Sequence, residues 1–250
     1  MDIFSLRKKL KTDTSIGTWM QIPSPIVANL LSIQDFDWVT LDLEHGRFDN
    51  NLIGDLFSII KSNNCLPFAR LLSTCSQSEI SSVLDAGASG LIFPKVESVE
   101  QARCIYRYSN LPPTGNRGVA FCHANNYGNN FDKYLEEGQN TFLVGMIETV
   151  EGSKNLQSII SECIFDAFII GPYDLSASLG LTGQFEAPDF VNTLDTLYDS
   201  FKSSATPFGS HIVYPSDIQL ISSIKSGCSF IPYGIDTTFL ANLLPSINQS

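Results

Sequence analysis

The chain has 250 residues, of which 43% are hydrophobic and 16% charged, and its formal net charge is −11 at pH 7. This length and composition fit one folded domain and exclude a disordered chain, while the acidic balance argues against nucleic acid or an anionic membrane as a partner. No apolar run reaches the roughly 20 residues of a membrane helix and the N-terminus lacks a signal-peptide core, so we expect a cytoplasmic protein.

Short apolar runs alternate with amphipathic segments along most of the chain. Runs typical of buried strands occupy residues 16–22, 38–43, 67–71, 90–93, 142–147, 167–170, 207–213 and 230–233. Apolar residues spaced three and four apart predict helices over 23–33, 52–62, 77–86, 98–106, 151–163, 187–203, 216–226 and 237–247. Eight strands alternating with eight helices predict a single-domain α/β fold, the (β/α)8 TIM barrel, over residues 1–250. An open doubly wound sheet would carry G-x-G-x-x-G after its first strand, and this motif is absent there.

One segment, at about residues 110–139, breaks this alternation. It is rich in glycine, proline and asparagine. A long irregular segment inside an otherwise regular fold is more often functional than accidental. We therefore expect a functional excursion loop there.

Polar and charged residues follow the predicted strands. In a parallel barrel the carboxyl ends of the strands meet at one end, where the active sites of such barrels lie. The residues expected at that end are Gln21, Asp42, Glu44, His45, Arg70, Lys95, Glu148, Asp174, His211 and Asp236. Arg70 ends an otherwise apolar strand and therefore requires an anion, from the protein or from a ligand. Asp42 alternates with apolar residues in its strand, so its carboxylate is expected in the barrel mouth, where it needs a partner.

Glu148 and Asp174 form the most informative pair in this set. Each follows an apolar run, and the helix predicted between the runs makes a right-handed crossover that brings both strand ends to one edge of the sheet. Two neighbouring carboxylates repel each other, and a divalent cation with oxygen ligands is the usual remedy. The pattern predicts a metal site. The alternative is that both side chains are solvated loop acids.

The cysteines are spread along the chain without a C-x-x-C pair. They are Cys65, Cys75, Cys104, Cys122, Cys163 and Cys228. This spacing predicts neither a zinc site nor a disulfide framework. We therefore expect free thiols, which are typical of a reducing compartment.

Six segments, in the same order along the chain, resemble the metal-dependent class II pyruvate aldolases of the 4-hydroxy-2-oxoheptanedioate aldolase family. They are LDLEHG (41–46), PFARL (67–71), VLDAGASGLIFPKVES (83–98), PPTGNRGVA (112–120), MIET (146–149) and IGPYDLSASLG (170–180). The resemblance extends from about Gly17 to Asp236. It implies a (β/α)8 barrel, usually a hexamer, that reversibly cleaves a 4-hydroxy-2-oxo acid to an aldehyde and pyruvate or a related 2-oxo acid.

The resemblance also implies roles for individual residues. It implies Glu148 and Asp174 as ligands of Mg²⁺, Mn²⁺ or Co²⁺, and His45 as the proton acceptor. It implies Arg70 as the group that stabilises the enolate, and Asp85 as the acid that raises the basicity of His45. Because Asp85 falls near the end of a predicted helix, away from the mouth, a neighbouring subunit is one possible source of it. The full catalytic and substrate-binding sets are His45, Arg70, Asp85 and Asp42, and Arg70, Met146, Gly171, Pro172, Tyr173, Asp174 and His211.

Two residues depart from the family pattern. Met146 stands where relatives often have a glutamine that contacts the substrate, and His123 stands where an arginine is expected. Both changes keep the expected metal ligands and the expected base. They indicate a different pocket for the aldehyde half of the substrate, and His211 is a candidate for that pocket.

Three alternatives to the metal aldolase stay open at this point. A synthase or transferase of the same barrel would join an enolate or an acetyl-CoA-derived carbanion to a 2-oxo acid. A metal-free aldolase would use Lys95 to form a Schiff base. A non-catalytic barrel would bind an acid without the two carboxylates.

Overall fold

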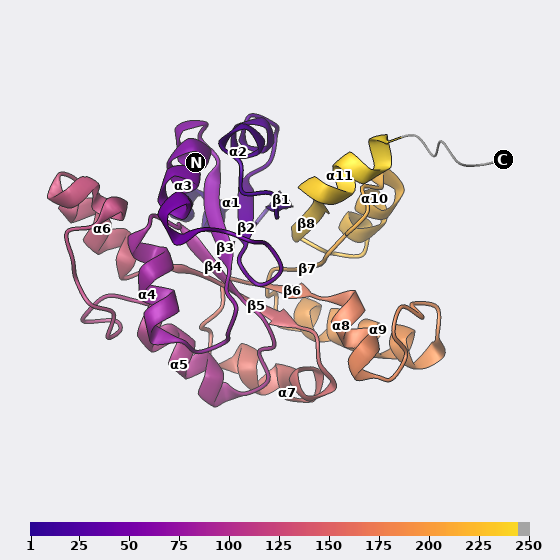
Figure 1. Cartoon of the computed structure of the whole chain (residues 1–250). Helices are drawn as coiled ribbons and strands as arrows, with labels where there is room; N and C mark the ends of the chain where they lie inside the picture. Colours follow the sequence, from indigo (N-terminus) through magenta and orange to yellow (C-terminus); the bar gives the residue numbers. More distant parts are fainter. Residues whose placement is uncertain (245–250) are drawn as a thin grey trace.

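The computed structural model describes residues 1–244 and shows a barrel of parallel strands surrounded by helices (Figure 1). The strands follow the sheet order β7-β6-β5-β4-β3-β2-β1-β8, and every neighbouring pair is parallel. One parallel bridge, between Ile212 and Tyr233, joins the two ends of the sheet. The barrel is therefore nearly closed, and the predicted (β/α)8 fold is confirmed.

The eight strands form where the apolar runs predicted them. Their bounds are β1 (Ser15–Met20), β2 (Trp38–Asp42), β3 (Leu66–Arg70), β4 (Gly90–Phe93), β5 (Phe142–Ile147), β6 (Ala167–Ile170), β7 (Phe208–Ser210) and β8 (Phe230–Ile235). The largest difference is in β7, which is much shorter than the predicted strand. After Ser210, the His211 backbone N–H still donates to the Ile170 carbonyl of β6 at 3.2 Å, and that of Ile212 donates to the Pro232 carbonyl of β8 at 3.0 Å.

All eight predicted helices form, within a few residues of their predicted bounds. They are α2 (Pro25–Ser32), α3 (Asn50–Ser62), α4 (Gln77–Asp85), α5 (Val99–Ser109), α7 (Val150–Ser161), α9 (Pro188–Ser203), α10 (Asp217–Lys225) and α11 (Asp236–Leu243). Of the helix expected at 237–247, residues 245–247 lie outside the described part of the chain. None of the helices within residues 1–244 has the length and apolar character needed to cross a membrane.

Three further α-helices and one 3-10 helix were not predicted. They are α1 (Ile3–Lys9), η1 (His123–Gly128), α6 (Phe131–Gly138) and α8 (Pro172–Ser178). In α1, Asp2 accepts a hydrogen bond from the Ser5 backbone at 2.7 Å, and Ile3 and Leu6 are buried, so a cap and an apolar face were present in the sequence. The excursion at 110–139 thus contains η1 and α6 rather than being irregular throughout.

The interior of the barrel and its outer surface are packed by alternate residues of each strand. Four aromatic side chains fill the interior below the mouth: Trp38, Phe68, Phe142 and Phe230, with ring centroids between 4.6 and 6.4 Å apart. Residues of the opposite parity, such as Val39, Leu41 and Phe168, pack against the helices. Because the interior is filled, the mouth at the carboxyl ends of the strands is left as the place where polar side chains gather.

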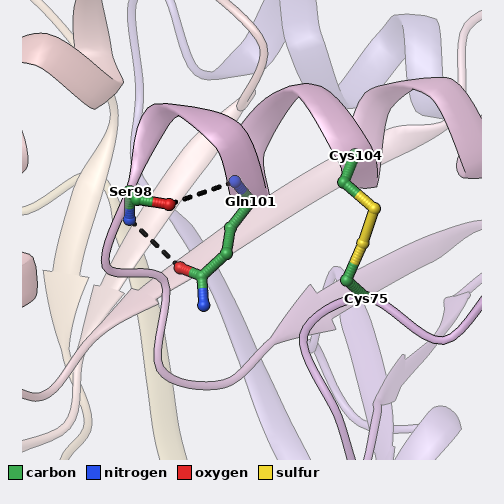
Figure 2. Close-up of a disulfide and its surroundings, with 4 residues drawn as sticks. All are labelled: Cys75, Ser98, Gln101 and Cys104. Atoms are coloured by element: carbon green, nitrogen blue, oxygen red, sulfur yellow. Dashed lines mark hydrogen bonds between the residues drawn. A yellow bond between two sulfur atoms is a disulfide. The ribbon is translucent and has the colours of Figure 1, made fainter.

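The expectation that all six cysteines are free is wrong for two of them. Cys75, in the loop between β3 and α4, forms a disulfide with Cys104 of α5 (Figure 2). The residues are 29 positions apart in sequence, but α4 and α5 pack side by side, and the Cα atoms are only 6.3 Å apart. Sequence spacing could not reveal this pairing, because it depends on the packing of two consecutive β/α units.

Candidate active site

Arg70, the last residue of β3, lies at the centre of a charged network in the barrel mouth. Its Nε and Nη2 donate to the two carboxylate oxygens of Asp42 at 2.8 and 2.7 Å, and its Nη1 lies 3.1 Å from Glu44 Oε2. Strands β2 and β3 are neighbours, with Asp42 paired directly to Arg70 in the register. The anion that the sequence required for Arg70 is therefore supplied by the chain itself.

Asp42 is fully buried and accepts four hydrogen bonds. Besides the two from Arg70, it accepts one from Gln21 Nε2 at 2.8 Å and one from the His45 backbone N–H at 3.2 Å. Burial by itself would raise the pKa of this carboxyl, but the hydrogen bonds and charge of Arg70 outweigh it and hold the pKa below its usual value. The His45 contact also fixes the loop that follows β2, which carries Glu44 and His45.

Glu148 follows β5 directly and is buried, with 2% of its surface exposed. Its Oε1 accepts a hydrogen bond from the Lys95 backbone N–H at 2.8 Å, and Lys95 adopts a left-handed backbone with φ of 50° to make it. Burial, and then the negative charge of Asp174, raise the pKa of Glu148 to about 7. Glu148 follows β5 directly and Asp174 lies in the first turn of α8 after β6, so the two acids follow neighbouring strands.

The space beside Glu148 is preserved by Gly171, which follows β6. A Cβ atom at this position would lie 2.6 Å from Glu148 Oε2 and 3.0 Å from its Cβ, so any larger residue would displace the carboxylate. The Lys95 hydrogen bond occupies only Oε1, and Asp174 stands exposed in the first turn of α8. Two carboxylates that follow neighbouring parallel strands are a donor set that fits a hard cation such as Mg²⁺ or Mn²⁺.

This donor set is small. Among residues 1–244 there is no group of three or more His, Cys, Asp and Glu side chains that could hold a metal ion. Oxygen-ligated Mg²⁺ usually keeps several waters and takes one or two carboxylates from the protein. The pair formed by Glu148 and Asp174 fits that pattern and leaves coordination positions for a substrate.

His45 lies at the rim of the mouth, with 58% of its side chain exposed. Its Nε2 is 3.9 Å from Glu44 Oε2, and Glu44 also contacts Arg70. The imidazole is therefore next to the arginine network and open to a ligand that enters from solvent.

His211 and Trp19 form a second layer under the mouth. Their rings stack with centroids 5.0 Å apart and an interplanar angle of 20°, and Arg70 Cζ lies 4.4 Å from the Trp19 ring. Burial lowers the pKa of His211 to about 4, so this histidine is neutral near pH 7. Trp19 was missed by the sequence reading. The signal in the sequence was its position two residues before Gln21, which follows β1, because alternate residues of a strand point to the same side.

The other predicted substrate-binding residues lie around Glu148. Met146 is buried on the inner face of β5, and its Cε is 3.5 Å from the point that a Cβ on Gly171 would occupy. Pro172 begins α8, and the exposed Tyr173 packs edge-on against Phe185 with ring centroids 5.0 Å apart. The structure thus places Met146, Gly171, Pro172 and Tyr173 beside the predicted metal ligands.

Asp85 is not part of this mouth within one chain. As the last residue of α4 it lies at the opposite end of the barrel, because the helices run antiparallel to the strands. Its Oδ1 is 3.3 Å from Nη1 of the buried Arg117, and burial raises its pKa although Arg117 opposes that shift. His123 also lies at that end, with its ring packed over Gly54 and Gly87. The catalytic role of Asp85 stays a prediction that requires another subunit.

Comparisons with known proteins place this geometry in context. The sequence profile of the HpcH/HpaI aldolase/citrate lyase family matches residues 15–242. A hydroxypyruvate/pyruvate aldolase of Roseobacter denitrificans is 32% identical over 243 residues, which cover 94% of this chain and 91% of the relative. A 5-keto-4-deoxy-D-glucarate aldolase of Salmonella paratyphi A is 30% identical over 222 residues, 88% of this chain and 86% of the relative. A crystal structure of a family protein from Burkholderia cenocepacia has a TM-score of 0.88 at 24% identity and covers 95% of both chains.

Proposed function

The chain belongs to the HpcH/HpaI aldolase/citrate lyase family, and from that premise we propose that it is a divalent-metal-dependent aldolase. The reaction is the reversible cleavage of a 4-hydroxy-2-oxo acid to an aldehyde and pyruvate, or a related 2-oxo acid such as hydroxypyruvate. The observation that carries the proposal is the buried Glu148, which shares the mouth with Asp174 and whose Oε2 is packed against Gly171. Mg²⁺, Mn²⁺ and Co²⁺ are the cations proposed for this pair.

The cation supplies Lewis acidity toward the carbonyl of the 2-oxo acid when it is bound. The residues of the chain supply binding and charge. Arg70 provides a fixed guanidinium at the place where negative charge develops as the bond between C3 and C4 breaks. Because Asp42 and Glu44 already hold this guanidinium in position, little reorganisation is needed during the reaction.

Proton transfer is assigned to His45. In the cleavage direction its imidazole takes the proton of the 4-hydroxyl group while the aldehyde carbonyl forms, and it returns the proton in the synthetic direction. The exposed position of His45 at the rim, next to Glu44, gives it access to a substrate bound above the mouth. His211 is partly buried and its pKa is lowered to about 4, so it is assigned to the substrate pocket rather than to proton transfer.

The decisive experiment is an aldol assay with purified protein, pyruvate or hydroxypyruvate, Mn²⁺ and a panel of short aldehydes. We expect an aldol product whose formation stops with EDTA and with the Glu148→Gln variant. Glu151→Gln is the matched control, since Glu151 is an acid in the first turn of α7 only three residues away, and it should retain activity. Absence of product from the wild-type protein with every aldehyde would overturn the proposal.

A synthase of the same barrel is the second candidate. It is favoured by Met146, whose thioether replaces a polar amide beside Gly171 and changes what the pocket can bind. Incubation with acetyl-CoA and oxaloacetate separates the two functions, because only the synthase gives a condensation product from this pair. The aldolase proposal predicts no such product.

We also propose that the protein forms a homo-oligomer. Large apolar side chains are exposed on α2, α10 and α11, including Ile26 at 72%, Ile218 at 83% and Leu243 at 81%. Covering them would remove apolar surface from water. Light scattering coupled to size-exclusion chromatography should give a mass that is a multiple of 27.5 kDa; a monomer at micromolar concentration would contradict this proposal.

A further inference from the structure

The disulfide between Cys75 and Cys104 joins a loop beside the candidate active site to the helix α5. Cys75 belongs to the loop 71–76, which begins directly after Arg70 and ends where α4 starts. Cys104 lies in the middle of α5, the helix that follows the β4 strand and the Pro94–Lys95 turn (Figure 2). The bond therefore fastens the loop after β3 to the next β/α unit.

The loop 71–76 has a second link to that unit. Thr74 Oγ1 donates to the Pro94 carbonyl at 2.9 Å, one residue from Cys75. At the start of the loop, the Leu71 backbone N–H also donates to the Ile92 carbonyl of β4 at 3.0 Å. Within its own unit, the Glu79 carboxylate accepts from the Leu72 backbone N–H at 2.6 Å and from the Ser73 hydroxyl at 3.0 Å. Within the described residues, the disulfide is the covalent link and the Thr74 hydrogen bond is the side-chain hydrogen bond from this loop to the neighbouring unit.

The Pro94–Lys95 turn leads directly to Glu148. Lys95 holds a left-handed backbone with φ of 50°, which is strained for a residue with a Cβ, and its N–H donates to Glu148 Oε1 at 2.8 Å. The next residue, Val96, donates its N–H to the Met146 carbonyl of β5 at 3.1 Å. A strained turn persists only when its surroundings hold it, and the Thr74 contact is one of those supports.

We propose that the Cys75–Cys104 disulfide is a redox-controlled clamp that positions Glu148, acting through Thr74 and the Pro94–Lys95 turn. This inference rests on the proposed function of Glu148 as a metal ligand. In the oxidised enzyme the clamp holds the loop against the turn and the carboxylate in its binding position. In the reduced enzyme the loop keeps only hydrogen bonds, the turn relaxes, and metal affinity falls.

The redox step is a thiol–disulfide exchange with a dithiol. The dithiol supplies two electrons and two protons, the bond between the two sulfur atoms breaks, two cysteine thiols form, and the reductant becomes a disulfide. Cys75 and Cys104 are both partly exposed, so a dithiol can reach them. Cys65 and Cys228 are buried, and burial raises the pKa of Cys65 to about 12, so these thiols do not compete.

The test compares oxidised and dithiothreitol-reduced enzyme by two measurements, the Kd for Mn²⁺ from calorimetry and kcat/KM in the aldol assay. Outer contacts of metal ligands typically change affinity or activity by about 10- to 100-fold, and we expect a loss of roughly tenfold on reduction that reoxidation reverses. The Cys75→Ser/Cys104→Ser double variant should behave like the reduced enzyme in both redox states. Cys163→Ser, at an exposed free thiol, should respond to reduction as the wild type does.

Thr74→Val tests the route from the disulfide to Glu148. It removes the contact to Pro94 but keeps the disulfide, so Mn²⁺ affinity should fall and reduction should add little further loss. Hydrogen exchange of the Lys95 amide, expected to be faster in the reduced enzyme, reports the turn without catalysis. Equal Mn²⁺ affinity and equal Lys95 exchange in the two redox states would overturn the clamp. Absence of aldol product in both states would instead overturn the proposed function.

Discussion

The two sides of the barrel mouth bury a carboxylate in opposite ways. On the side of β1–β3, Asp42 accepts four hydrogen bonds, two of them from Arg70, and its pKa is held low. On the side of β5 and β6, Glu148 has one backbone hydrogen bond, faces the negative charge of Asp174, and has a pKa of about 7. The two carboxylates are almost equally buried, so their hydrogen-bond donors and neighbouring charges account for the difference in pKa.

This contrast indicates a structural role for Asp42 and a role in ligand binding for Glu148. Asp42 has its charge compensated within the chain, and its position serves to hold Arg70 and the loop with His45. Glu148 is buried with the Lys95 backbone N–H as its hydrogen-bond donor, and ionising a carboxyl group with so little compensation is costly unless a positive charge is supplied. The comparison therefore predicts different responses when each side is altered.

The largest effect is expected from Arg70→Ala. Removing the guanidinium should lower kcat by about 100- to 1000-fold, as for other preorganised charge-stabilising donors. It should also lower the free energy of unfolding by about 3–5 kcal/mol, because Asp42 becomes an unpaired buried charge. Urea denaturation and steady-state kinetics measure the two effects. The double variant Arg70→Ala/Asp42→Asn should recover stability without recovering kcat. If Arg70→Ala alone were as stable as the wild type, Asp42 would not depend on Arg70 for its stability in the folded protein.

The next effect concerns pH and metal affinity. Below pH 7 Glu148 carries a proton that the cation must displace, so the affinity for Mn²⁺ should rise about tenfold per pH unit from pH 5 and level off above about pH 7. Calorimetric titrations at several pH values measure this slope. In Glu148→Gln the affinity should be weak at every pH. A wild-type affinity that is flat between pH 5 and 7 would contradict the assignment of this carboxylate.

Asp85 is a third acid, which lies at the opposite end of the barrel and pairs with Arg117. If a neighbouring subunit brings it to His45, Asp85→Asn should lower kcat/KM by about tenfold, at the lower end of the range for the loss of an outer contact. The acidic limb of the pH profile of kcat/KM should also move to lower pH, because His45 becomes less basic. A variant that loses thermal stability while its pH profile stays unchanged would leave Asp85 as a partner of Arg117 only.

The smallest effect is expected from Gln21→Ala. Gln21 Nε2 gives Asp42 one of its four hydrogen bonds, and Thr237 Oγ1 holds the Gln21 amide oxygen at 3.1 Å. Asp42 keeps its three other hydrogen bonds, so losing this one should cost about 1 kcal/mol, which corresponds to roughly a fivefold drop in kcat if Arg70 shifts with Asp42. KM should change little. A drop as large as that of Arg70→Ala would mean that Gln21 contacts the substrate directly.

Much of the fold was readable because it depends on local patterns. The runs at Phe142–Ile147 and Ala167–Ile170 are strands with the predicted bounds, since short apolar runs between polar segments suit fully buried parallel strands. The same pattern placed Glu148 and Asp174 at one edge. The short helix α8 was missed although Pro172 is at its first position, because seven residues are too few for a periodic signal.

The amino-acid sequence by itself determined the barrel, the family and the residues at the strand ends, because strand and helix periodicity and the order of motifs are properties of the chain alone. Only the tertiary structure decided which side chains meet: Arg70 with Asp42 and Glu44, Asp85 with Arg117, and Cys75 with Cys104. These contacts join β/α units whose spacing depends on barrel closure and helix packing. Asp42 and Glu148 are both acids at the end of a strand, yet the pKa of Asp42 is lowered and that of Glu148 is raised to about 7. Only their neighbours in space account for this difference.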